Sequence, residues 1–456
     1  MRERMENALR VADADYAEIR IENATSTATA FRGKELDSID ASTSVGGIVR
    51  ALVKGGWGQA TFNALEDLES RVTEACESAH LVGKERTQFA GVEPVVDEVA
   101  AALDRDFRGV SLADKTSVIE AYNQIVLGHH DKIETSTVRY HDRFRTVWYA
   151  NSEGTFIKDE RPGVGILISA TARDGDTVQQ GFESVAGNSG FQVIEGNHDK
   201  AETVAKRAVD LLGAPPVKGG TYTVITNPKL TGVFAHEAFG HLSESDFVYE
   251  NERMKEIMVL GKRFGPDILN IIDDGAIPGL RGTHRYDDEG VKTQKNYLIK
   301  DGLLVGRLHS RETAAKMDET PTGNARAISY AHQPIVRMTN TYVDKGDATF
   351  EEMIRDVKLG LYACDMVGGQ TAMEMFTFSA GYGYMIRDGE VAELVRDVVL
   401  TGNVFETLMN IDRIGDAVEW PSVGGGCGKG GQMPLPVGFG GPHVRIQNVV
   451  VGGQQQ

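Results

Sequence analysis

The sequence predicts an α+β fold in which two N-terminal α/β segments precede a mostly antiparallel, β-rich C-terminal domain. Up to residue 213, stretches with helical spacing of apolar residues alternate with strand-like stretches. Residues 213–220 then join two prolines to paired glycines, which interrupts helices and sheet ladders alike. Beyond this point, short alternating segments punctuated by glycine dominate. We therefore expect domains at residues 1–87, 107–213 and 220–456.

Local patterns predict the first elements in order. Residues 1–12 have helical spacing of their apolar side chains, and residues 16–62 alternate as strands separated by glycine-containing turns. Asn63 is placed to cap a helix that ends near Gly83. Residues 88–108 lack clear periodicity, so we interpret them as a connection between the first two domains.

The remaining helices and strands are predicted in the same way. Ser111 is placed to cap a helix that runs to Gly128. In the C-terminal domain, one helix surrounds His236 and another covers residues 350–361. The central domain also contains two strand-like stretches and an amphipathic helix, at residues 133–157, 163–171 and 199–212.

The composition excludes several classes of function. The chain has 456 residues, with 48 Lys and Arg against 66 Asp and Glu, so its formal net charge is −18 at neutral pH. This acidic excess argues against proteins that follow nucleic-acid phosphates or adsorb to anionic membranes. No apolar run approaches the roughly 18 residues of a membrane span, and the charged N-terminus lacks the apolar stretch of a signal peptide. Three cysteines do not form a disulfide framework, so we expect a cytoplasmic protein.

The sharpest local motif is H-E-x-x-x-H, formed by His236, Glu237 and His241. It is one residue longer than the H-E-x-x-H of zinc peptidases, in which two imidazoles bind zinc and the glutamate activates water. Positions five apart lie about 140° apart around an α-helix, so the two rings would not share a face. They can converge if the helix widens into a π-type turn or ends between them, and Gly240 is the least costly place for that distortion. The alternative is a surface helix with two unrelated histidines.

A catalytic zinc site usually has three protein ligands and one open position. Cys427 is the candidate third ligand, because a thiolate binds zinc well and its flanking glycines allow the backbone to approach a metal. The alternatives are a flexible loop with an incidental thiol and a phosphate-binding loop. The phosphate-binding loop fails because Lys429 is followed by Gly430 rather than Ser or Thr, and Val423 stands where its first glycine belongs.

A further polar segment contains Tyr330, His332 and Arg337. These residues are possible oxyanion or substrate contacts in a hydrolase, although a strand with a polar, solvated face explains them equally well. Three consecutive acids at residues 287–289 are interpreted as a solvated turn or an inter-subunit contact, because the ligands of an EF-hand alternate. Cys76 and Cys364 are expected to be buried thiols.

Taken together, these segments resemble the TldD/PmbA family, the modulator-of-gyrase-type metallopeptidases, and its TldD side in particular. The resemblance covers residues 224–453, about half of the chain, and the N-terminal half agrees in layout. Besides the H-E-x-x-x-H helix, the family-like segments in order are Glu244 with Asp246, residues 273–275, 286–290, 321–324, 330–332 and 337–342, Phe378-Ser379, residues 427–429 and 436–438. Cys364 and Ser245 depart from the family pattern, which leaves substrate preference and local loop shape open.

The resemblance implies α/β N-terminal domains and a β-rich C-terminal domain that carries one zinc ion. It implies that His236, His241 and Cys427 are the ligands and that Glu237 is the general base for a zinc-bound water. Small unfolded peptides or proteolytic fragments are the implied substrates. A homodimer, or a heterodimer with a homologous subunit that lacks the metal motif, is the implied assembly.

A different class of function competes with this hypothesis. The chain would then be a catalytically silent peptide-binding or assembly subunit with a structural zinc. Such a site has four protein ligands. The sequence offers Glu244 or His332 for the fourth position, so the number of ligands separates the two hypotheses.

Overall fold

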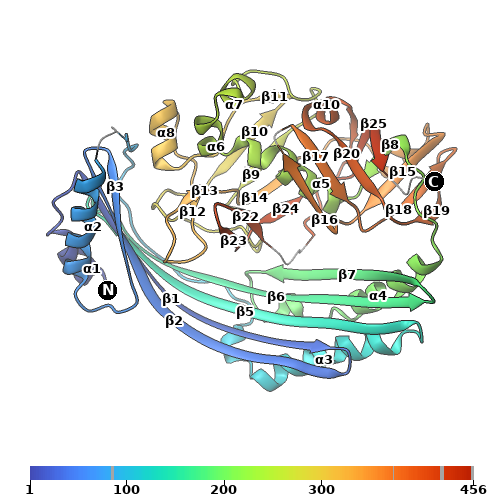
Figure 1. The fold of residues 1–456 in the computed structure, drawn as a ribbon, viewed down its shortest axis with the longest axis horizontal. Coiled ribbons are helices and arrows are strands. Elements are labelled where there is room, and N and C mark those ends of the chain that lie inside the picture. The colour runs from blue at the N-terminus through green and yellow to red at the C-terminus, as the bar shows by residue number, and fades with distance from the viewer. Residues whose placement is uncertain (84–86, 373, 422–425, 453–456) are drawn as a thin grey trace.

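The computed structural model describes residues 1–83, 87–372, 374–421 and 426–452. Long, curved strands of the N-terminal half form a sheet that runs beneath the C-terminal domain (Figure 1). The C-terminal domain contains two further main sheets and several short helices. The α+β class predicted from the sequence is therefore confirmed. None of the helices in the described ranges is long and apolar enough to cross a membrane.

The first sheet combines strands from both N-terminal segments. Its order is β3-β2-β1-β5-β6-β4, and β7 also pairs with β6. Strands β1 and β5 join the two segments through antiparallel pairing from Glu18↔Asn151 to Arg32↔Thr137. The strands are β1 (Tyr16–Arg32), β2 (Glu35–Val53), β3 (Gly56–Phe62), β4 (Val96–Val99), β5 (Ile133–Asn151), β6 (Phe156–Asp174) and β7 (Thr177–Gly187).

Helices cover the sheet at its two ends and enclose two separate cores. The α1 helix (Arg2–Leu9) and the α2 helix (Leu68–Val82) pack on β1–β3. The α3 helix (Leu112–Gly128) and the α4 helix (His198–Gly213) pack on β5–β7, near the short η1 (Phe107–Gly109) and η2 (Phe191–Ile194). These two clusters of buried apolar side chains hold the helices against the sheet at each end.

Two of the predicted helix starts can be compared with the structure. Ser111 caps α3 as predicted, because its side chain accepts a hydrogen bond from the Asp114 backbone N–H. The prediction that Asn63 caps the earlier helix is wrong, since α2 begins at Leu68 with Asp67 at its N-cap. The predicted connection before α3 contains the strand β4. This strand pairs in parallel with β6, which lies about 60 positions later in the chain, so the local sequence pattern did not reveal it.

The C-terminal domain is built around a nine-stranded sheet of order β16-β17-β20-β25-β8-β15-β18-β19, with β21 paired to β25. The pairing is antiparallel except between β8 and β15. The strands are β8 (Gly220–Thr226), β15 (Leu359–Cys364), β16 (Gly368–Ala372), β17 (Met375–Ser379), β18 (Tyr382–Arg387), β19 (Glu390–Val395), β20 (Val399–Asn403), β21 (Ile411–Ile414) and β25 (Val444–Gly452).

A five-stranded sheet of order β11-β10-β9-β14-β24 and two short strand pairs complete the domain. The strands are β9 (Ile271–Asp274), β10 (Lys295–Lys300), β11 (Leu303–Leu304), β12 (Ala325–Arg326), β13 (Ile335–Val336), β14 (Asn340–Val343), β22 (Cys427–Lys429), β23 (Gln432–Leu435) and β24 (Gly438–Gly440).

The helix that carries the H-E-x-x-x-H motif lies between the two main sheets. The α5 helix (Pro228–Ala235) contacts β8 and β15 of one sheet and β14 and β24 of the other. Further short helices are α6 (Ser245–Glu250), α7 (Glu252–Ile257), α8 (Arg311–Met317), α9 (Phe350–Ile354) and α10 (Val404–Met409). The predicted helix over residues 350–361 is too long, because the chain re-enters the large sheet as β15 at Leu359.

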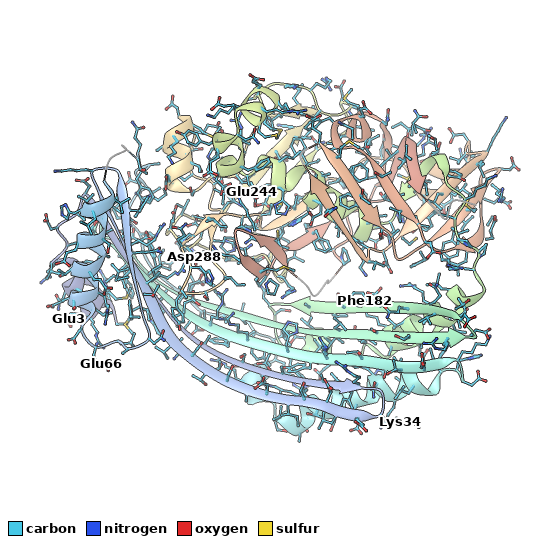
Figure 2. The ribbon with its side chains drawn as sticks, viewed as in Figure 1. Glu3, Lys34, Glu66, Phe182, Glu244 and Asp288 are labelled. Atoms are coloured by element: carbon cyan, nitrogen blue, oxygen red, sulfur yellow. The ribbon has the colours of Figure 1, made fainter. Side chains whose placement is uncertain are left out.

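The acidic turn at residues 287–289 joins the two halves of the molecule. Asp288 accepts a hydrogen bond from Arg161 of β6 at 2.7 Å, and Glu289 accepts one from Arg50 of β2 at 3.1 Å. All three acids of the turn are buried, and Figure 2 shows Asp288 on the side of the C-terminal domain that faces the long sheet. The interpretation as a solvated turn is therefore wrong. Arginines distant in the sequence pair with Asp288 and Glu289 in the interior, and Asp287 accepts hydrogen bonds from three backbone N–H groups.

Candidate metal centre

The two motif histidines lie on one side of a widened helical turn. Asn227 caps α5 by accepting a hydrogen bond from the Leu230 backbone N–H, and α5 then continues into the π-helical turn η3 (His236–Gly240). The His241 backbone N–H donates to the His236 carbonyl, five positions earlier. A π turn brings residues five apart onto one face, as the spacing of the motif required. The 3-10 turn η4 (His241–Ser243) follows directly.

Gly240 fits this turn for a different reason from the one predicted. Its φ of −56° is ordinary for a helix, so the position does not need the conformational freedom of glycine. A Cβ atom at this position would overlap the Sδ atom of Met338. The glycine therefore allows the chain around Met338 to pack directly against the turn that carries the histidines.

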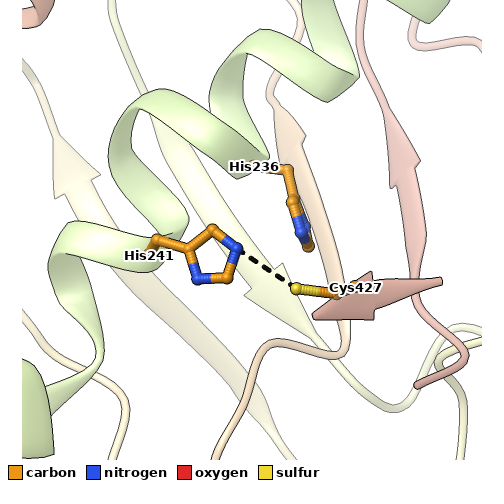
Figure 3. Close-up of side chains that lie close together, drawn as sticks. All are labelled: His236, His241 and Cys427. Atoms are coloured by element: carbon orange, nitrogen blue, oxygen red, sulfur yellow. Dashed lines mark hydrogen bonds between the residues drawn. The ribbon is translucent and has the colours of Figure 1, made fainter. Parts of the chain in front are cut away.

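Cys427 completes a group of three potential metal donors (Figure 3). One donor atom from each of His236, His241 and Cys427 lies within 4.8 Å of the others. The Cys427 Sγ atom is 3.1 Å from the His241 Nε2 atom, and the two imidazole ring centres are 5.2 Å apart. His236 and Cys427 are only 3% and 6% exposed. The sequence analysis predicted this convergence, and it is the one such donor group found among the described residues.

A tight hairpin presents the thiol to the two histidines. Cys427 begins β22, which pairs antiparallel with β23, and Cys427 lies opposite Leu435. A Cβ atom at Gly426 would lie 2.6 Å from the Cβ atom of Pro434, so only glycine fits beside the facing strand. The remainder of the predicted glycine-rich loop, at residues 422–425, lies outside the described residues.

The three donors fit a zinc ion in both chemistry and spacing. Zinc binds imidazole nitrogen at about 2.0–2.1 Å and thiolate sulfur at about 2.3 Å, so donors of a tetrahedral site lie about 3.3–3.6 Å apart. The observed group needs only small side-chain adjustments to reach these separations. The His236 Nδ1 atom is also buried and has no hydrogen-bond partner within the described chain. A buried imidazole nitrogen without a partner is consistent with a site built to hold a metal.

The local charges favour the thiolate form of Cys427. Burial raises the pKa of this thiol, but hydrogen bonds and charge from His236 and His241 outweigh burial and lower the pKa to about 5. Burial lowers the pKa of His241, whereas Glu244 and Cys427 raise it, with a net pKa of about 10. Without metal, the site therefore holds a thiolate beside an imidazolium at neutral pH, and the thiolate is the form that binds metal.

Glu244 contacts the His241 ring nitrogen that faces away from Cys427, and Lys429 in turn pairs with Glu244. The His241 Nδ1 atom lies 3.0 Å from the Glu244 carboxylate, and Lys429 Nζ lies 3.0 Å from the same carboxylate. Lys429 also donates to Asp246 at 2.6 Å. A carboxylate at Nδ1 fixes the tautomer that leaves Nε2 free to bind a metal. Lys429 was not predicted to contact Glu244, although its position two residues after Cys427 on a short strand offered a signal for this role.

Glu237 lies next to the donor group without joining it. Its Oε2 atom is 4.0 Å from the His241 Nε2 atom, and 27% of its side chain is exposed. The carboxylate therefore lies within reach of the three donors and is partly open to solvent. A carboxylate in such a position is a candidate for proton transfer.

The other predicted contact residues form hydrogen bonds away from the donor group. The Tyr330 hydroxyl donates to Asn63 at 2.9 Å, and the His332 ring lies 3.0 Å from the Ser329 hydroxyl. Arg337 is fully buried and donates to the Gln432 carbonyl of β23 at 3.2 Å. Their role as oxyanion or substrate contacts stays a prediction. Cys76 and Cys364 are buried free thiols, as predicted.

Family models match nearly the whole chain in three consecutive parts. Residues 17–79 match the PmbA/TldA metallopeptidase domain 1, residues 105–212 match the central domain, and residues 219–453 match the C-terminal domain.

Three similar proteins are metalloproteases, and two of them match over almost the whole chain. A metalloprotease from Synechocystis is 47% identical over 443 residues, which cover 97% of this chain and 96% of that protein. A zinc metalloprotease TldD homolog from Saccharolobus solfataricus is 30% identical over 448 residues, covering 96% and 97%. A metalloprotease TldD homolog from Haemophilus influenzae is 35% identical over 313 residues, covering 66% and 64%.

Solved structures share the fold at low sequence identity. A Thermotoga maritima protein described as a modulator of a DNA gyrase has a TM-score of 0.80 and 20% identity, covering 99% of this chain and 100% of that one. TldE from Thermococcus kodakarensis has a TM-score of 0.77 and 17% identity, with the same coverage. These structures support the α+β architecture described above.

Proposed function

Because the chain belongs to the PmbA/TldD family of metallopeptidases, we propose that it is a zinc peptidase that cleaves small unfolded peptides or proteolytic fragments. One zinc ion per chain would bind His236, His241 and Cys427, with Glu237 as general base. The observation that carries this proposal is the convergence of two imidazoles and a thiol beside a partly exposed carboxylate. The zinc metalloprotease among the relatives supports the choice of metal.

The residues around the site have distinct roles in this proposal. Zinc would supply a Lewis acid that activates water and polarises the scissile carbonyl. Glu237 accepts the proton of the attacking water at its carboxylate and passes it to the leaving amine. Glu244 holds His241 by its Nδ1 atom, which leaves Nε2 free to bind the metal. Lys429 compensates the negative charge of Glu244, which reduces the free-energy cost of burying this carboxylate.

The competing hypothesis is a silent peptide-binding subunit with a structural zinc, which needs a fourth protein ligand. Glu244 was one candidate, but its carboxylate engages His241 Nδ1 and Lys429. His332 was the other, and its ring is paired with Ser329. Neither belongs to the group of three donors in the described chain. This favours a site with an open position, and hence a catalytic one.

We further propose that the protein is cytoplasmic and works as a dimer, either with itself or with a homologous subunit that lacks the metal motif. The outer part of the β1–β2 hairpin supports an assembly role. Residues 35–44 are exposed along the whole segment and include Leu36 and Ile39, at 45% and 50% exposure. Light scattering of the purified chain, alone and mixed with such a homologue, tests this proposal.

The peptidase proposal is tested with the Glu237→Gln variant, incubated with a mixed pool of unfolded peptides and read by mass spectrometry. We expect about one zinc per chain in wild type and variant, and a loss of cleavage by about 10²- to 10⁴-fold in the variant. Glu250→Gln is the matched control, because Glu250 is an exposed carboxylate nearby on α6. Peptide binding without new termini in the zinc-loaded wild type would instead support the silent subunit.

A further inference from the structure

A cavity of about 820 Å³ lies between the long N-terminal sheet and the C-terminal domain. Strands β5 and β6 form one wall, and residues 276–293, 326–328 and 434–436 form the other. Residues 99–104 contribute to the rim. A volume of this size is typical of sites that bind small molecules or short segments of a ligand, about 300–1,000 Å³.

The lining of this cavity is cationic, although the chain as a whole carries a net charge of −18. Among the described residues, seven Arg or Lys side chains line it against four Asp or Glu side chains. Arg161 alone binds two of the four acids, Asp159 at 2.8 Å and Asp288 at 2.7 Å. The sign of the lining is therefore opposite to that of the whole molecule, so an anion inside would meet attraction rather than repulsion.

Three of the lining cations have no carboxylate partner in the described chain. Arg326 donates only to backbone carbonyls, those of Met338 and Pro436. Arg143 and Lys292 form no ion pair and no side-chain hydrogen bond with described residues, and Lys292 is exposed. A buried or half-buried guanidinium without a counter-ion is energetically unfavourable, and a bound carboxylate would relieve that cost.

Two histidines, His141 and His284, line the cavity, and the pKa of each is lowered. His141 lies on β5, and its side chain lines the cavity. Burial among the cavity walls and the charge of Arg281 lower the pKa of His141 to about 4. Burial also lowers the pKa of Arg281 to about 10. Both shifts disfavour positive charge: burial and the charge of Arg281 cause the shift of His141, and burial causes that of Arg281.

The cavity adjoins the metal centre through the β22–β23 hairpin. Leu435 lines the cavity and is the strand partner of Cys427, so the two backbones are about 5 Å apart. Arg326 provides a second connection, because it donates to the carbonyl of Met338, whose side chain packs against Gly240 between the two histidines. A peptide cleaved at the metal centre would therefore place a nearby residue or its terminus within reach of the cavity.

We propose that this cavity binds carboxylate groups of the peptide substrate, which gives the enzyme a preference for peptides with negative charge close to the cleaved bond. The carboxylate can come from an acidic side chain or from a free C-terminus, since both offer two oxygens to a guanidinium. The proposal rests on the peptidase function above. Peptides with a carboxylate close to the cleaved bond would then be the substrate class that the peptidase selects.

The test uses four N-terminally dansylated ten-residue peptides of otherwise identical sequence. They carry two glutamates or two glutamines and end in a free carboxylate or an amide. Binding is measured by fluorescence anisotropy with the full-length chain stripped of metal, so that turnover does not interfere. We expect the peptide with glutamates and a free C-terminus to bind about tenfold more tightly than the glutamine amide. The two intermediate peptides identify which carboxylate is recognised.

The Arg143→Gln/Lys292→Gln double variant should lose this preference while it keeps its affinity for the glutamine amide. Arg173→Gln is the matched control, because Arg173 is an exposed arginine on β6 that does not line the cavity. Equal affinity for all four peptides in the wild type would overturn the proposal, as would a preference that survives in the double variant. If only the peptidase function were wrong, the result would differ. The chain would still prefer the peptides with carboxylates, but the zinc-loaded chain would produce no new peptide termini.

Discussion

The Nε2 atom of His241 and the Sγ atom of Cys427 lie 3.1 Å apart, although 186 positions separate the two residues in the chain. His241 ends a π turn between the two main sheets of the C-terminal domain, and Cys427 begins a hairpin near the end of that domain. A metal bound to both would cross-link segments that are otherwise joined by packing alone. Metal binding and local stability of the hairpin should therefore be coupled.

The first prediction concerns the metal content of cysteine variants. Cys427→Ala removes one of three donors and should reduce zinc from about one per chain to a trace, measured by elemental analysis of protein purified without chelators. Cys364→Ala is the matched control. Cys364 is equally buried, and burial, together with the charge of Asp365, raises its pKa to about 12, so it stays a protonated thiol. Full zinc in Cys427→Ala would exclude the thiol as a ligand.

The second prediction concerns the pH dependence of zinc affinity. In the metal-free chain the pKa of Cys427 is about 5 and that of His241 about 10. The thiolate is thus already formed at pH 7, whereas His241 must lose a proton before Nε2 can bind zinc. Affinity should rise about tenfold per pH unit between pH 7 and pH 9, measured by competition with a chromophoric chelator.

A variant of Glu244 provides the control for this pH dependence. Glu244 is one of the groups that raise the pKa of His241. Glu244→Gln removes that charge, so the rise in affinity should level off at a lower pH than in the wild type. A wild-type affinity that does not change between pH 7 and pH 9 would contradict the proton displacement at His241.

The placement of the two histidines in the candidate metal centre was predictable because local spacing constrains it, whereas Cys427 reaches them from 186 positions away. Two histidines five positions apart can share a metal only if the helix widens, and the structure contains that π turn. The role of Gly240 was not predictable in the same way, since Met338 lies almost a hundred positions away and only the folded chain brings it against the turn. Spacing predicts a local distortion, whereas packing that requires a small residue depends on the tertiary structure.

The acidic turn at residues 287–289 illustrates the limit of local charge patterns. Three consecutive acids normally indicate solvent exposure, and the burial of Asp288 depends on Arg161, 127 positions away in the chain. Tyr330 is a similar case, because its hydroxyl partner Asn63 is 267 positions away. In both cases a partner far away in the chain determines the environment of the polar side chain. A single sequence contains no periodicity that reveals such a partner.

The third prediction tests the packing at the π turn. Gly240→Ala forces Met338 to move and should lower the free energy of unfolding by about 1–3 kcal/mol, with weaker zinc binding. Gly128→Ala is the matched helical control, because a Cβ atom there meets no neighbour within 4 Å, and its effect should be neutral or slightly stabilising. Combining Gly240→Ala with Met338→Ala should cost less than the sum of the two single changes, since the overlap is then removed. Strict additivity in urea unfolding would show that the two side chains do not interact.

The fourth prediction concerns the contact between the long sheet and the C-terminal domain. Burial raises the pKa of Asp288, but the charges of Arg161 and Arg20 outweigh it and hold the pKa below its ordinary value. Asp288→Asn leaves these buried guanidinium groups without that charge and should destabilise the fold by about 3 kcal/mol at pH 7. Asp267→Asn, at a side-chain exposure of 83% beside Arg263, should cost less than about 1 kcal/mol.

The pH dependence of this fourth effect has a definite sign. A carboxylate whose folded-state pKa is lowered stabilises the fold above its unfolded pKa, about 3.9, and loses that stabilisation as the pH falls further. The difference in urea midpoint between wild type and Asp288→Asn, taken from the first unfolding transition, should therefore be largest near neutral pH. It should shrink below about pH 4, as the wild-type carboxylate begins to take up protons on unfolding. A difference that is constant from pH 7 to pH 3 would assign the effect to packing of the side chain rather than to its charge.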